Sequence, residues 1–244
     1  SGQPTSEIQG TMMHKTSYNI EPYKGFTRSD SMSYLGGRTQ ETMRFKLSNN
    51  KHNFTFVWDK DKGEKINNSF LKIGYQGNFN HYVKQVNAGA YSLCVGEGLV
   101  HSNSFIVGKN NPLNSFYKIQ HSLKINSSSA EYNYENGFAL TYQIKKINII
   151  GFYSINTLNG NVDNDTITSL KQDGLFRTRS EIDYVNAGRY QLIGNSIKYD
   201  FNKTTIAFNT LKTTFSKPYK PSPNYYNRNY SIYKLWNNSI NYRF

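Results

Sequence analysis

Apolar and polar residues alternate with a period of two along most of this chain. One segment places Met43, Phe45 and Leu47 on one face of an extended strand and Arg44 and Lys46 on the other. A short Asn-Asn-Lys-His turn follows, and a second alternating segment comes after it. Together they predict a β-hairpin.

The same alternation recurs at 138–145, 147–155, 197–201, 206–208 and 240–244. No segment shows the apolar spacing of an amphipathic helix over a useful length. We therefore expect an all-β antiparallel meander forming a single domain over residues 1–244. Within it, 1–37 would hold N-terminal strands or loops, and 216–229, which contains three of the six prolines, a long loop.

Two architectures fit a sheet of this size, a soluble β-sandwich or barrel and an outer-membrane β-barrel. The load of 20 Tyr and 15 Phe favours the membrane barrel, because aromatic residues collect where such barrels meet the two membrane interfaces. The C-terminal residues Ile240, Tyr242 and Phe244 look like the aromatic end signal of such barrels. The sequence thus predicts a transmembrane barrel of roughly 12–16 strands, or part of a larger one.

Composition removes several other classes of protein. No run of about 18 apolar residues is present, which excludes a helical membrane protein. A single cysteine, Cys94, excludes an internal disulfide framework, and five scattered histidines offer no close pair for a metal, so we expect no cofactor. The net charge of +13 suits polyanionic partners, which include nucleic acid, lipopolysaccharide and anionic lipids.

A family resemblance rests on ordered short motifs, the Asp-Lys-Gly-Glu turn at 61–64, the glycine-bearing segment 89–99, Gly108-Lys109 and the segment 174–181. The chain resembles, over about residues 38–215, the barrel portion of Bacteroidota outer-membrane proteins that carry an N-terminal competence-type helix-hairpin-helix domain. It departs from them in having Glu97 where Gln is usual, and members of the family are longer. The resemblance implies part of a barrel in which Gly63, Gly89, Gly96 and Gly98 are structural residues at turns or bends.

Charged residues at 177–183 form the most informative constellation. On an extended strand, Arg177, Arg179, Glu181 and Asp183 would share one face. Such a row suits a hydrated lumen, where together with Arg44 and Lys46 it would set selectivity, because charges are costly against lipid. The alternative is the solvated face of a soluble sheet.

Other motifs do not indicate catalysis. Gly96-Glu97-Gly98 lacks the Lys-Ser/Thr of a phosphate loop and is placed in a strand by the resemblance. The acidic turn 59–64 lacks the distal Glu of a calcium loop and is expected to be a solvated turn, and Glu131 and Glu135 are expected to decorate a loop. No nucleophile elbow is present, so we do not expect an enzyme.

The function that the sequence predicts is a non-catalytic outer-membrane channel or transport component with a charged lumen, in contact with outer-membrane lipids and lipopolysaccharide. A soluble basic protein that binds nucleic acid through aromatic and basic residues such as those at 225–230 is the competing hypothesis. A structural subunit that packs against other envelope proteins is a third.

Overall fold

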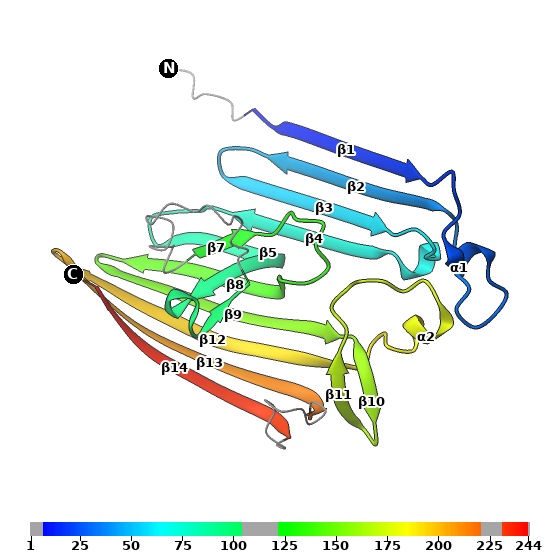
Figure 1. Ribbon diagram of the computed structural model, residues 1–244. Helices are drawn as coiled ribbons and strands as arrows, with labels where there is room; N and C mark the ends of the chain where they lie inside the picture. The colour runs from blue at the N-terminus through cyan, green and yellow to red at the C-terminus, as the bar shows by residue number, and fades with distance from the viewer. Residues whose placement is uncertain (1–6, 104–121, 221–230, 244) are drawn as a thin grey trace.

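The structure is a computed structural model, and it describes residues 7–103, 122–220 and 231–243. These residues form one 14-stranded sheet with two one-turn α-helices, α1 (Lys24–Thr27) and α2 (Arg179–Ile182), and two 3-10 turns, η1 (Ile66–Asn68) and η2 (Gly96–Gly98) (Figure 1). The strands are β1 (Gln9–Tyr18), β2 (Thr39–Ser48), β3 (His52–Lys60), β4 (Phe70–Gly77), β5 (Val83–Val95), β6 (His101–Ser102), β7 (Ser122–Ile125), β8 (Glu135–Ile144), β9 (Ile147–Leu158), β10 (Gly160–Asp163), β11 (Thr166–Leu170), β12 (Gly188–Phe201), β13 (Thr204–Tyr219) and β14 (Ile232–Arg243).

The strand order follows the chain closely. The main path runs β1-β2-β3-β4-β5-β8-β9-β12-β13, with antiparallel neighbours throughout, and β14 pairs with β13. One parallel contact, between Ile167 and Tyr219, joins the β10–β11 hairpin to β13. The all-β class is confirmed, whereas the described sheet is open, with β1 and β14 at its two ends (Figure 1).

Connections are short at one end of the sheet and long at the other. Four short turns, at 49–51, 78–82, 145–146 and 202–203, lie at what we call the short-turn end. The connections at the opposite, long-connection end run over 19–38, 61–69 and 159–187, and the described residues 126–134 lead into β8 from the same end. In the two-residue turns, Lys145 and Asn202 have φ of 49°, the left-handed conformation that tight hairpin turns require.

The two faces of the sheet differ in which side chains they carry. We call the face that holds Glu135 and Asn209 the inner face, and the face that holds Phe208 and Ile240 the outer face. Across five neighbouring strands, β8, β9, β12, β13 and β14, one lateral row on the outer face is entirely apolar: Tyr142, Ile149, Ile197, Phe208 and Ile240. The inner face carries polar residues at the neighbouring register, where Ser196 lies between Ile150 and Asn209. The exposed fractions are 46% for Phe208 and 0% for Asn209, so at this register the apolar side chain is outside and the polar one is buried. The inner face also carries buried apolar residues, among them Ile150, Leu192 and Leu211.

A segment between β5 and β8 covers part of the inner face. We call its described parts, 96–103 and 122–134, the inner segment. Its Leu123 carbonyl accepts a hydrogen bond from Gln85 at 2.8 Å, and the Ile125 N–H donates to Gln76 at 3.0 Å. The buried apolar cluster lies between this segment and the sheet: Tyr91, Leu93, Val95, Val100, Leu123, Ala139, Ile150, Phe152, Leu192 and Leu211.

Three local predictions were wrong. Residues 179–182 form helix α2 rather than a strand, because Thr178 and Glu181 make a capping box that starts a helical turn. Residues 216–219 extend β13 rather than open a loop, and 221–229 lie outside the described residues. Residues 96–98 form η2 and end strand β5.

Neither α-helix in the described ranges is long and apolar enough to cross a membrane.

Replacing Gly89 by alanine should destabilise the fold. Gly89 has a φ of +79°, and a Cβ there would lie 2.3 Å from the Ile73 carbonyl oxygen. This oxygen is a backbone atom of β4, so it cannot move without distorting the sheet. We expect Gly89→Ala to lower the free energy of unfolding by about 1–3 kcal/mol in urea titrations followed by tryptophan fluorescence. Gly151→Ala is the matched control, because a Cβ at Gly151 meets nothing within 4 Å. Equal stability of the two variants would contradict the role of Gly89.

Candidate functional site

The inner face holds a buried carboxylate with several partners. Glu135, at the start of β8, is 1% exposed. Its carboxylate accepts hydrogen bonds from Ser154 Oγ at 2.6 Å and Asn156 Nδ2 at 2.5 Å. His101 Nε2 of the inner segment lies 3.0 Å from the second carboxylate oxygen, which makes an ion pair when the ring is protonated. A buried charge needs such partners to offset its lost hydration.

Two further polar clusters continue along this face. Lys72 of β4 donates from Nζ to Asn126 Oδ1 at 2.9 Å and to the Ala130 carbonyl at 3.1 Å, which ties the inner segment to the sheet. On the other side, Asn209 of β13 accepts from Ser196 Oγ at 2.5 Å and donates to Ser239 Oγ at 3.0 Å. In these two clusters, polar groups buried between strands are paired with one another.

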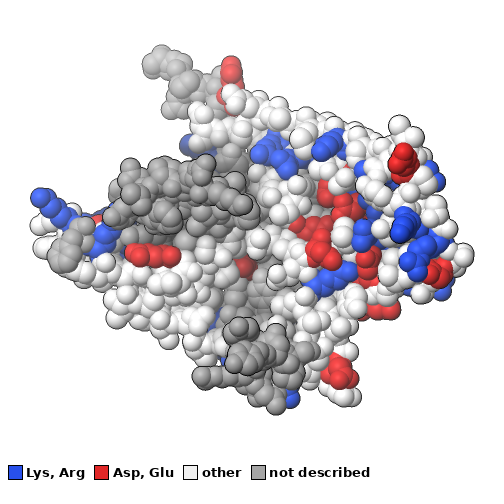
Figure 2. All heavy atoms as spheres, viewed as in Figure 1, with Lys and Arg blue, Asp and Glu red and all other residues white. Residues whose placement is uncertain are grey.

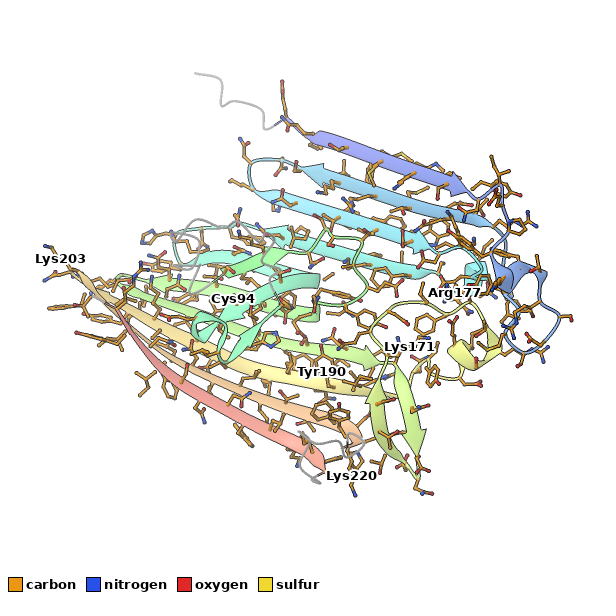
Figure 3. The ribbon with its side chains drawn as sticks, viewed as in Figure 1. Cys94, Lys171, Arg177, Tyr190, Lys203 and Lys220 are labelled. Carbon is orange, nitrogen blue, oxygen red and sulfur yellow. The ribbon has the colours of Figure 1, made fainter. Side chains whose placement is uncertain are left out.

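A cleft of about 660 Å³ opens at the long-connection end. Amide side chains line much of it: Asn67, Asn68, Asn103, Asn133, Asn136, Asn156, Asn159, Gln172 and Asn186. Phe70, Tyr132, Tyr134, Phe176 and Tyr190 supply its rings, and Glu131, Glu135, His101 and Lys171 its titratable groups. Figure 3 labels two of its lining residues, Tyr190 of β12 and Lys171 after β11.

Beside the cleft lies a group of crowded carboxylates. Oxygen atoms of Asp59, Asp61 and Glu131 lie within 4.8 Å of one another. Burial, and to a smaller extent the nearby carboxylates of Glu64 and Asp61, raise the pKa of Glu131 to about 8. The three oxygens could hold a cation, but burial and the neighbouring carboxylates favour the protonated form of Glu131 near neutral pH, which works against one.

The turn that contains Glu64 is not solvated as the sequence suggested. Glu64 is 1% exposed and accepts hydrogen bonds from the Phe176 N–H at 2.7 Å and the Asp61 N–H at 3.1 Å. Burial raises its pKa. The side chain therefore fastens the connection after β11 to the turn after β3. The expectation that Glu135 decorates a loop was likewise wrong, since this carboxylate lies buried in a strand.

Arg44 and Lys46 lie on the inner face, as the alternation predicted. They are in register with Val57 and Thr55 of β3, and Thr55 bonds to the Asn126 carbonyl of the inner segment at 3.5 Å. These two cations are thus on the face where the polar clusters gather.

The other four predicted lumen residues are in and beside helix α2. The Arg177 guanidinium lies 3.0 Å from the Glu181 carboxylate and 4.9 Å from the centre of the Tyr34 ring. Arg177 and its hydrogen bonds hold the pKa of Glu181 below its usual range, against the effect of burial, which is the larger single influence and acts in the opposite direction. Arg179 and Asp183 are exposed. The four do not form a ladder on one strand face, because the helical turn separates them.

The predicted structural residues can also be placed. Gly63, Gly89, Gly96 and Gly98 all have positive φ. Ile240 and Tyr242 lie on the outer face of β14, opposite Phe208 and Ile206 of β13. Phe244, Gly108-Lys109 and the segment 225–230 lie outside the described residues.

Sequence reasoning missed His101, Lys72 and the amides of the cleft. A lone His or Lys carries no signal of its partners, which come from β8 and the inner segment. The helix α2 did have a signal, because Thr178-Arg-Ser-Glu181 matches the capping-box spacing.

Charges of both signs mix on the face shown in Figure 2. Lys and Arg side chains alternate there with Asp and Glu side chains near the long-connection end, around α1 and α2. Among the described residues, this face shows no continuous basic patch of the kind that binds a phosphate backbone.

The chain was compared with known proteins, and no protein-family model, curated protein sequence or solved structure matches it.

Stability should fall as the pH rises through the titration of Glu131. Its pKa rises from 4.5 to about 8 on folding, so the folded protein binds more protons than the unfolded chain between these values. The contribution of the protonated Glu131 carboxyl to the free energy of unfolding is complete below pH 4.5 and is lost as the pH rises through 8. After allowance for solvent screening, we expect a loss of about 1–2 kcal/mol in the free energy of unfolding.

Urea titrations at pH 5, 6.5 and 8 measure this loss. Glu131→Gln should reduce the slope, leaving the part that comes from Asp61 and Glu64, whose pKa values burial also raises. Asp183→Asn, at an exposed position of the same end, should leave the slope unchanged. An unchanged slope in Glu131→Gln would show that this carboxyl ionises normally.

Proposed function

We propose that this chain is an outer-membrane β-barrel, or part of one, that passes polar or charged solutes along its inner face. Outer-membrane lipids and lipopolysaccharide contact its outer face. Its role is non-catalytic. The proposal combines the sequence pattern and the family resemblance with the distribution of side chains over the two faces of the sheet.

The exposure of large apolar side chains on the outer face, while polar side chains are buried within the fold, is the observation that carries the proposal. Ile240 and Trp236 are 75% and 64% exposed on the outer face, while Glu135 is 1% exposed within the fold. A soluble sheet gains free energy by burying its apolar face, about 25 cal/mol for each Å². A sheet whose outer face meets lipid has no such need, because hydrocarbon replaces the missing partner.

The arrangement of turns supports the same proposal. Outer-membrane barrels have short turns on the periplasmic side and longer loops on the extracellular side. The four short turns here lie at one end, and the long connections at the other. We therefore assign the cleft, at the long-connection end, to the extracellular side.

One experiment separates the membrane barrel from a soluble protein that binds nucleic acid. The chain is refolded with lipid vesicles, floated on a density gradient, and run on gels with and without heating. We expect co-flotation with the vesicles and a heat-dependent shift in mobility. A monodisperse protein that stays in the aqueous fraction without detergent and binds oligonucleotides would contradict the proposal.

Lysine on the outer face should impair membrane insertion. Ile240 is 75% exposed, so a soluble protein would tolerate Ile240→Lys, whereas in lipid a lysine costs about 1–4 kcal/mol depending on its depth. Asn237→Lys is the matched control, on the inner side of the same strand opposite Leu211. The fraction that floats with vesicles should fall for Ile240→Lys alone. Equal flotation of both variants would exclude lipid contact at Ile240.

Charge reversal at Lys46 should change ion selectivity. Lys46 lies on the inner face between Thr11 of β1 and Thr55 of β3. In planar bilayers with a KCl gradient, Lys46→Glu should shift the reversal potential towards cation preference. Arg179→Glu makes the same charge change in exposed helix α2 and should leave the potential nearly unchanged. Inserted protein without conductance would rule out passage and favour a structural role.

A further inference from the structure

The described sheet has a notch at its long-connection end, where the two strands between β4 and β9, which are β5 and β8, do not pair with them along their full length. Strand β4 starts at Phe70 but pairs with β5 only from Gly74 onwards. Strand β9 continues to Leu158, yet its pairing with β8 stops at Ser154. The segments 70–73 and 155–158 therefore flank a gap, which the start of β8 only partly fills.

The notch exists because β5 bends away from the wall. Beyond Gly89, β5 is no longer paired with β4, stays paired with β8 as far as Glu135, and pairs with β7 of the inner segment through Tyr91–Cys94. Three glycines, Gly74, Gly89 and Gly137, lie side by side on β4, β5 and β8 where the bend begins. A Cβ on Gly137 would lie 2.1 Å from the Tyr153 carbonyl oxygen, so the backbones approach at a distance that only glycine permits. The gap is thus built into the sequence.

The cleft passes through this notch. Its lining includes Leu71 and Ile155, which are 55% and 37% exposed, and Asn156 and Glu135, which meet in the buried cluster. Along β9, Ile155 and Asn156 point to opposite faces. The cleft therefore connects the outer face with the inner face at the long-connection end.

The chemistry of the cleft favours a neutral, hydroxylated ligand. Its amides offer donors and acceptors together, and within the described residues the buried Nδ2 atoms of Asn68 and Asn103 have no hydrogen-bond acceptor. An anion would meet the carboxylate of Glu135. A cation would meet the ammonium of Lys171, which also lines the cleft.

We infer that the cleft binds the uncharged, polyhydroxylated headgroup of a membrane amphipath, whose acyl chain leaves through the notch into the surrounding lipid. The headgroup hydroxyls bond to the amides, and the rings of Tyr132 and Tyr190 pack against its apolar faces. The exit of the chain rests on the proposed membrane location, whereas recognition of the headgroup does not.

Trp58 is a native reporter for this site. It lies opposite Leu71 in the β3–β4 register, and its Nε1 donates to Ser69 Oγ, another lining residue, at 2.8 Å. In a Trp236→Phe background, which leaves Trp58 as the single tryptophan, the protein is placed in phosphatidylcholine nanodiscs. Dodecyl maltoside with a spin label on its alkyl chain is then added, and quenching of Trp58 fluorescence is measured.

We expect quenching that saturates and that unlabelled dodecyl maltoside reverses. Maltose alone should reverse it at higher concentration, and dodecylphosphocholine, with the same chain and a zwitterionic head, should not. Asn68→Leu should weaken binding at least tenfold, because it removes an amide whose donor is unpaired in the described fold. Asn237→Leu, an exposed amide on β14, should leave binding unchanged.

Two results would overturn the inference. Quenching that rises linearly with probe would indicate partitioning into lipid alone, and equal competition by both detergents would indicate a site for the alkyl chain without headgroup recognition. Failure of the proposed function is distinguishable, since the protein would then not enter nanodiscs at all. In that case, isothermal titration of the soluble protein with maltose tests the headgroup site, and absence of binding there also overturns it.

Discussion

The bend of β5 at the glycine row determines how the rest of the molecule is arranged. A regular strand would stay paired with β4 along the whole length of β4, whereas the pairing observed covers only Gly74–Gly77. Because Gly89 adopts a positive φ beside the Ile73 carbonyl, the second half of β5 runs inward and pairs with β7. The inner segment, the buried apolar cluster and the cleft all follow from this change of direction.

The inward turn also explains why the small apolar core lies on a face that is otherwise polar. Leu93 and Leu123 enter with β5 and β7 and cover Leu192 and Leu211 of the wall. Elsewhere on the inner face, amides, hydroxyls and a carboxylate bond to one another across strands. The protein thus has apolar packing where the inner segment lies and hydrogen-bonded polar side chains beyond it.

Much of the sheet could be predicted from the sequence, because the two-residue period of a β-strand determines which face each side chain occupies. Alternation placed Met43 and Phe45 opposite Arg44 and Lys46, and the pairing of β2 with β3 agrees. Alternation failed at 177–183, where charges at every second position also fit a capped helical turn, and the local bonds of Thr178 and Glu181 decided between them. The cleft could not be predicted, because its parts meet only through the bend of β5.

The buried polar pairs have a further consequence for strand register. Slipping β13 by one residue against β12 would turn Phe208 inward and Asn209 outward, and it would break the contact of Asn209 with Ser196. The slip would thereby remove the Asn209 acceptor from the Ser196 hydroxyl, which is 1% exposed. A hydrogen bond lost in the protein interior costs more than one lost in water, so both changes disfavour the slipped alignment. Asn209 therefore contributes less to the net stability of the fold than to the specificity of the strand register. It makes the observed register of β12 and β13 more stable than the registers shifted by one residue.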